Sequence, residues 1–152
     1  MYIKDVLEKH KNKNISLFID MDGTIADYEL KYPIYYKNSR PLLDRINLLK
    51  ELLNIYTNVE VYILSASATK KGLEEKNYWL DKYFNIKKEN RIIIYRAPRE
   101  EKTSADKKLD FLNNFDTDDL IIVIDDDPVV LKTINKHKNK NMILLKDSCL
   151  SK

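Results

Sequence analysis

The sequence predicts an α/β fold: a three-layer sandwich in which helices cover both faces of a mostly parallel sheet. The chain of 152 residues can bury one sizeable core and is too short for two ordinary domains, so residues 1–152 are treated as a single domain. Short apolar segments alternate with segments of helical periodicity, which is typical of this class. Polar side chains directly follow three of the apolar segments, where parallel sheets bind their ligands.

Five short apolar segments are predicted to be buried strands. The first, Ile15–Ile19, follows a polar stretch and ends at Asp20. The other four cover residues 59–64, 91–95, 120–124 and 142–146. Most of their side chains are β-branched or aliphatic, as expected for parallel strands that are covered on both faces.

Four segments between and after these strands have helical periodicity. Pro41 can open the first helix, the second covers residues 70–84, Ser104 is the expected cap of the third, and Pro128 begins the fourth. In the second helix, Trp79 is expected to belong to the core. The periodic positions of the four segments are, in order, Leu42, Ile46, Leu49 and Leu53; Leu73, Asn77, Leu80 and Phe84; Leu109, Leu112 and Phe115; and Val130, Leu131 and Ile134. Strands alternating with helices in this way favour a Rossmann-like sheet with right-handed crossovers.

Residues 25–40 show no regular period. They contain four tyrosines and a proline, which are Tyr28, Tyr32, Tyr35, Tyr36 and Pro33. Because this segment lies between the first strand and the helix expected at Pro41, we predict a short flap that forms a minimal cap over the site.

The composition excludes several classes of function. Gly23 and Gly72 are the only glycines, so neither the GxxxxGK[ST] phosphate loop nor the GxGxxG dinucleotide turn can be formed. His10, His137 and Cys149 do not make a zinc ligand set. The net charge of +3 is too small for a dedicated nucleic-acid binder, although it suits phosphorylated substrates.

The sequence favours a cytoplasmic protein that does not enter a membrane. Its longest aliphatic run, residues 120–124, is far too short to cross a bilayer. Residues 1–5 lack the apolar stretch of a secretory signal. The single cysteine, Cys149, cannot form an internal disulfide and fits a reducing compartment.

Two carboxylates follow the first strand in the segment Asp20-Met21-Asp22-Gly23-Thr24. The glycine permits a tight turn, and carboxylate oxygens are suitable ligands for a hard cation such as Mg²⁺. A carboxylate can also attack phosphorus to form an acyl phosphate, and a second one can protonate the leaving alkoxide and then activate water. We therefore predict that Asp20 is a nucleophile and Asp22 an acid/base; the alternative is that both are polar turn residues.

Three further carboxylates follow the strand at residues 120–124. Asp125, Asp126 and Asp127 would repel one another unless a cation relieved the crowding. The alternative is that they form the N-terminus of the helix that begins at Pro128. The predicted metal ligands are Asp20, Asp22, Asp125 and Asp126, and which residue of the acidic run binds the metal directly stays open.

A site with four aspartates and a phosphate dianion needs a lysine in addition to one magnesium ion. Lys102 is the first choice, with Lys107 and Lys108 as rivals on the following helix. Ser65, directly after the second strand, can offer its hydroxyl to a phosphoryl oxygen, and Ala66 can offer its backbone N–H.

These four segments, in this order, resemble the motifs of the haloacid dehalogenase superfamily of phosphotransferases. Asp20–Thr24 resembles the DxDGT motif, Ile63–Ser65 the second motif, Lys102 the third, and Asp125-Asp126 the terminal acidic pair. The resemblance implies that Asp20 forms an aspartyl phosphate and that Asp22 is the acid/base, with its backbone carbonyl on magnesium. It implies that Asp126 or Asp125 completes the protein ligands.

Within that superfamily, residues 20–28 and 76–80 are similar to the 5′(3′)-deoxyribonucleotidases. The resemblance implies a small phosphorylated substrate, a nucleoside monophosphate, and makes Tyr28 the one residue that carries over as a contact to the base. The other expected substrate contacts are Gly23, Thr24, Ala66 and Arg40.

Two alternatives remain beside the nucleotidase hypothesis. The segment at residues 96–102 and the short cap also resemble the phosphatase domain of polynucleotide kinase-phosphatases, which act on nucleic-acid ends. The other alternative is a phosphoryl-binding protein without turnover, although Asp20 and Asp22 are both present. A partner subunit could shield so open a site, so an oligomer is compatible with the sequence.

Overall fold

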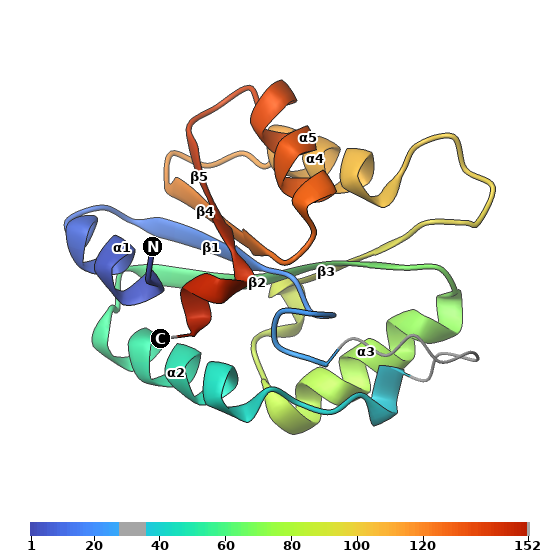
Figure 1. Cartoon of the computed structure of the whole chain (residues 1–152), viewed down its shortest axis with the longest axis horizontal. Coiled ribbons are helices and arrows are strands. Elements are labelled where there is room, and N and C mark those ends of the chain that lie inside the picture. Colours follow the sequence, from blue (N-terminus) through green and yellow to red (C-terminus); the bar gives the residue numbers. More distant parts are fainter. Residues whose placement is uncertain (28–35, 152) are drawn as a thin grey trace.

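In the computed structural model, which describes residues 1–27 and 36–151, five strands form one parallel sheet (Figure 1). The strand order is β3-β2-β1-β4-β5, and every neighbouring pair is parallel. The strands are β1 (Ile15–Ile19), β2 (Val59–Ser67), β3 (Arg91–Tyr95), β4 (Leu120–Asp125) and β5 (Met142–Lys146). This confirms the predicted fold class and all five strands, although β2 extends three residues beyond the expected end.

Helices cover both faces of this sheet. On one face lie α1 (Ile3–Lys9), α2 (Leu43–Ile55) and α3 (Lys70–Tyr83), and on the other lie α4 (Ser104–Asn114) and α5 (Pro128–His137) (Figure 1). Successive residues of a strand point to opposite faces, so Leu17 and Ile19 belong to the first core and Phe18 to the second. Within the described ranges, three short 3₁₀ helices cover Tyr36–Asn38, Lys88–Asn90 and Asp147–Leu150.

The helix starts differ in part from those predicted. The helix α2 begins at Leu43, so Pro41 precedes it and does not occupy its first position. The cap of α4 is Thr103, not Ser104: the Thr103 hydroxyl accepts a hydrogen bond from the backbone N–H of Asp106, whose carboxylate accepts one from the N–H of Thr103. The helix α5 begins at Pro128 as predicted, and α1 was not predicted.

The buried face of α3 is shifted from the predicted one. Leu73 and Asn77 are only half-buried, whereas Lys76 is fully buried and Trp79 belongs to the core, as expected. Gly72 explains the close approach of this helix to β2, because a Cβ at that position would lie 2.1 Å from the Ser67 hydroxyl. The face of α3 that meets the sheet therefore carries a lysine.

The ends of the predicted flap, residues 25–40, are held by backbone hydrogen bonds. The N–H of Asp27 donates to the carbonyl of Arg40 at 2.8 Å, and that of Leu42 donates to Ile25 at 2.8 Å. The indole of Trp79 on α3 donates to the carbonyl of Ser39 at 2.8 Å. The middle of the flap, residues 28–35, lies outside the described residues. No helix in the described ranges is long and apolar enough to span a membrane.

Candidate active site

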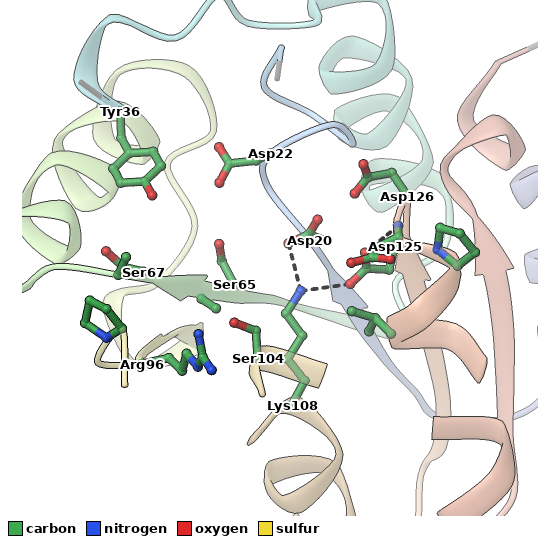
Figure 2. A pocket seen from close by; sticks show the side chains of 16 residues that line it. Asp20, Asp22, Tyr36, Ser65, Ser67, Arg96, Ser104, Lys108, Asp125 and Asp126 are labelled. Carbon is green, nitrogen blue, oxygen red and sulfur yellow. Dashed lines mark hydrogen bonds and ion pairs between the residues drawn. The ribbon is translucent and has the colours of Figure 1, made fainter. Parts of the chain in front are cut away.

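The predicted site lies where three central strands end. Because β1 aligns Ile19 with Ile63 of β2 and Ile124 of β4, the residues after these strands converge at one edge of the sheet. The backbone N–H of Asp20 donates to the carbonyl of Ile124 at 3.0 Å, which extends the ladder by one residue. A pocket of about 630 Å³ opens here (Figure 2). Its polar lining includes Asp20, Asp22, Ser65, Lys108, Asp125 and Asp126.

The loop after β1 is a compact turn that depends on glycine. The N–H of Gly23 donates to the carbonyl of Ala26 at 2.8 Å, and three N–H groups, those of residues 24–26, donate to the carbonyl of Met21. Gly23 has a φ of 82°, a conformation that other residues adopt at a cost. A Cβ there would also lie 2.1 Å from Oδ2 of Asp126. The glycine thus lets the first loop approach the acidic run after β4.

Of the three lysines considered from the sequence, Lys108 lies in the site and Lys102 does not. The Lys108 ammonium is buried and donates to Asp20 Oδ1 at 3.0 Å and to Asp125 Oδ2 at 2.8 Å (Figure 2). Burial alone would lower the pKa of Lys108, but the two carboxylates outweigh it and raise the pKa. Lys102 is exposed and pairs with Asp110 at 2.6 Å, which corrects our first choice. Lys107, the other rival, pairs with Glu100.

Three of the four predicted metal ligands form a carboxylate cluster. Asp20, Asp125 and Asp126 each offer an oxygen, and these oxygens lie within 4.8 Å of one another. Burial and the negative charge of Asp20 raise the pKa of Asp125 to about 6. Burial, a hydrogen bond with Asp20 and its charge raise the pKa of Asp126 to about 7. Such crowding is relieved by a divalent cation with oxygen ligands, so the donor set fits Mg²⁺.

The two interpretations of the acidic run apply to different residues. Asp125 and Asp126 belong to the carboxylate cluster. Asp127 is the N-cap of α5, where its side chain accepts a hydrogen bond from the backbone N–H of Val129 at 2.8 Å. Asp125 and Asp126, and not Asp127, are therefore the candidates for direct metal ligands in the acidic run.

The carboxylate of Asp22 lies outside this cluster and has a partner of its own. Its Oδ2 accepts a hydrogen bond from the Lys76 ammonium at 2.9 Å. Lys76 also donates to the Ser65 hydroxyl at 2.8 Å and to the carbonyl of Ala66 at 2.7 Å. Lys76 was not predicted as a site residue, and Ser65, which was predicted to follow the strand, lies within β2. The signal that could have identified Lys76 is its position one helical turn after Gly72 and before Leu80.

The predicted substrate contacts are brought to the pocket only in part. Ala66 lines it, but Gly23 and Thr24 do not, and Thr24 is fully buried. Arg40 points elsewhere: its guanidinium is exposed and pairs with Asp27 at 2.8 Å. Tyr28 lies outside the described residues. The lining also includes Tyr36 from the predicted flap, Arg96 from the segment at residues 96–102, and Ser67 and Ser104, which were not predicted as site residues (Figure 2).

Comparison with known proteins gives the fold and leaves the family open. No protein-family model matches the chain, and no curated protein matches it. Among solved structures, two chains of the Pnkp1/Rnl/Hen1 complex, in one case described as an RNA repair complex, share 15% and 16% identity over 89% of this chain, with TM-scores of 0.65 and 0.66. The present chain spans 43% and 46% of their lengths, less than half.

A second similarity covers most of both chains. The HAD domain of the effector protein Lem4 from Legionella pneumophila is 17% identical, with a TM-score of 0.53, over 87% of this chain and 84% of that domain. Identities this low show the fold alone. The five-stranded sheet of this protein is thus a sheet of the HAD type.

Proposed function

We propose that this protein is a magnesium-dependent phosphatase of the haloacid dehalogenase superfamily that forms an aspartyl phosphate on Asp20. The observation that carries the proposal is the buried ammonium of Lys108 between Asp20 and Asp125 at the edge of the sheet. A bare carboxylate cluster would repel a phosphate, whereas a buried cation beside a carboxylate attracts one and holds that carboxylate in place.

In the first chemical step, a carboxylate oxygen of Asp20 attacks phosphorus. The bond from phosphorus to the leaving oxygen breaks, and Asp22 gives that oxygen a proton. Because Lys76 donates to Ser65 Oγ, the hydrogen of the hydroxyl itself can be donated to a phosphoryl oxygen. Lys108 balances the charge beside the nucleophile.

In the second step, water replaces Asp20 on phosphorus. Asp22, now a carboxylate, takes a proton from the water as its oxygen bonds to phosphorus, and the bond to Asp20 breaks. Phosphate leaves and both aspartates return to their starting states. Asp20, Asp125 and Asp126 are the side chains that would hold Mg²⁺, which when bound offsets the negative charge of the phosphoryl oxygens.

The substrate class that we favour is the nucleoside monophosphates. A pocket of about 630 Å³ lies within the usual size range of sites for small ligands. Arg96 lines it, and its guanidinium donates to the carbonyls of Lys102 and Glu100, each at 3.1 Å. This anchoring places a positive charge beside the pocket at little cost in side-chain entropy.

A second candidate function is the removal of a phosphate from a nucleic-acid end. It is favoured by the similarity in fold to chains of an RNA repair complex and by the resemblance of residues 96–102 to polynucleotide kinase-phosphatases. An oligonucleotide would have to place its terminal phosphate in the same pocket, beside Asp20.

A substrate panel tests both candidates. The purified protein is assayed for phosphate release from deoxynucleoside monophosphates, a sugar phosphate and a 3′-phosphorylated oligonucleotide, with Mg²⁺ and with a chelator. We expect magnesium-dependent release, greatest with the mononucleotides. Asp20→Asn should abolish release while the protein stays folded; turnover by that variant would remove Asp20 as the nucleophile. Binding of phosphate without turnover by the wild type would instead support a phosphoryl-binding protein.

A further inference from the structure

The side chain of Lys76, on α3, is fully buried and lies behind residues that line the pocket. Its ammonium has three hydrogen-bond acceptors: Asp22 Oδ2 at 2.9 Å, Ser65 Oγ at 2.8 Å and the carbonyl of Ala66 at 2.7 Å. The ring of Tyr36 covers it, with its centre 4.4 Å from the ammonium. The buried ammonium of Lys76 is therefore paired with three hydrogen-bond acceptors and one aromatic ring.

A buried lysine is costly unless its charge is paired, and a core position on α3 would be better filled by an apolar side chain. The position follows Gly72 by four residues and precedes Leu80 by four, so it belongs to the face of α3 that packs on the sheet. Among the described residues, Asp22 is the one carboxylate that the Lys76 ammonium contacts. This arrangement indicates that the function of the Lys76 ammonium is to bind the Asp22 carboxylate, and not to stabilise the core.

The two lysines of the site have separate partners. Lys108 contacts Asp20 and Asp125. Lys76 contacts Asp22 and two residues of β2 that line the pocket, Ser65 and Ala66. Figure 2 shows Asp22, Ser65 and Tyr36 bordering the same part of the pocket. A single ammonium thus connects the proposed acid/base to the proposed phosphate-holding strand end.

We propose that Lys76 is a positioning residue that orients the carboxylate of Asp22 toward the leaving oxygen. The proposal rests on the phosphatase function proposed above. Lys76 holds Oδ2, and Oδ1 is the oxygen that carries the proton. The contacts to Ser65 and Ala66 fix the ammonium relative to the phosphoryl group, so Asp22 keeps a defined distance from the bond that breaks.

The choice of substrate can separate this role from a merely structural one. A p-nitrophenolate leaves as a stable anion and needs little protonation, whereas the alkoxide of a nucleoside 5′-monophosphate needs a proton as it leaves. The quantity compared between the two substrates is kcat/KM, which reports the steps up to and including departure of the leaving group. Both substrates form the same aspartyl phosphate, and its later hydrolysis does not affect kcat/KM.

The experiment compares Lys76→Met with Lys82→Met, a matched change at an exposed position of the same helix. We expect Lys76→Met to lower kcat/KM by about 100-fold or more for a nucleoside 5′-monophosphate and by less than about 10-fold for p-nitrophenyl phosphate. Lys76→Arg should restore part of the loss for the nucleotide, and Lys82→Met should change neither substrate.

Two further variants keep the test decisive. Lys76→Gln removes the charge and keeps a hydrogen-bond donor on a side chain one bond shorter, and it makes the same comparison if the methionine variant does not fold. Asp22→Asn should show the same dependence on the leaving group, and adding Lys76→Gln to it should change kcat/KM by less than about 3-fold, because the group to be positioned is gone.

The results that would overturn the proposal are distinct from failure of the phosphatase function. An equal loss of kcat/KM for both substrates would make Lys76 a contact to the phosphoryl group or a structural residue. Unchanged kcat/KM for both substrates would remove it from the reaction. A wild-type protein that is inactive on both substrates with Mg²⁺ would refute the proposed function itself.

Discussion

Replacing Lys108 by methionine is the sharpest test of how the site is held together. The side chain of Lys108 is only 6% exposed and its ammonium touches two carboxylates, at 2.8 and 3.0 Å. Methionine keeps the length and removes the charge, so Asp20 and Asp125 lose their cation while staying buried. Removing one partner of a buried ion pair costs about 3–5 kcal/mol.

That cost is a large part of the stability of a domain of this size, which is on the order of 5–15 kcal/mol. It corresponds to a fall in melting temperature of roughly 6–20 °C. The fall should be larger at pH 8 than at pH 5.5 in the absence of metal, because the carboxylates left behind can take up protons at the lower pH. With Mg²⁺ present, we expect kcat for phosphate release to fall by about 10²–10³-fold.

Lys102→Met is the matched control, since it makes the same change at an exposed lysine six residues earlier. Thermal melting with and without Mg²⁺ and phosphate release are measured on both variants. The control should melt and turn over like the wild type. The reasoning would be refuted if Lys108→Met melted within about 2 °C of the wild type, or if Lys102→Met were the variant that lost activity.

Four further outcomes follow from the structure. The pKa values of Asp125, about 6, and Asp126, about 7, lie above those of an unfolded chain, so the metal-free protein should lose stability as pH rises through this range. Protons compete with the metal, so the rise in melting temperature caused by Mg²⁺ should be larger at pH 8 than at pH 5.5; an equal rise would contradict these values. Gly23→Ala should lower both the melting temperature and kcat, because its Cβ would lie 2.1 Å from a carboxylate oxygen at a φ of 82°; unchanged values would show that the loop can move aside. Trp79→Phe removes the hydrogen bond to the carbonyl of Ser39 and should cost about 1–3 kcal/mol in urea unfolding, a loss that an unfolding curve like that of the wild type would disprove.

The sequence predicted the sheet and the carboxylates well because both are local signals. Five apolar runs correspond to five strands, and residues that directly follow a strand must lie at its carboxyl end. Asp20 and Asp125 could therefore be brought together from their positions in the chain alone. The register that aligns Ile19 with Ile124 then makes the two carboxylates neighbours.

The lysines of the site were harder to predict from the sequence, because a helix can present any of several residues to the sheet. Lys107 and Lys108 are neighbours on α4, and only the phase of this helix separates them, whereas Lys102 precedes the N-cap Thr103. The buried residues of that helix include Ala105, Leu109 and Leu112 along with Lys108. A lysine on the apolar face of a helix is thus the signal for a buried ammonium, and the same signal marks Lys76 on α3.

The two lysines come from opposite layers of the sandwich, Lys108 from α4 and Lys76 from α3. Between Asp20 and Asp22 in the sequence lies Met21, whose side chain is buried in the core on the side of α1, α2 and α3. Asp20 belongs to the carboxylate cluster, whereas the carboxylate of Asp22 lies outside that cluster and contacts the Lys76 ammonium. Two carboxylates two residues apart thus have different surroundings, and this difference is what a nucleophile and an acid/base require if they are to perform different steps of one reaction.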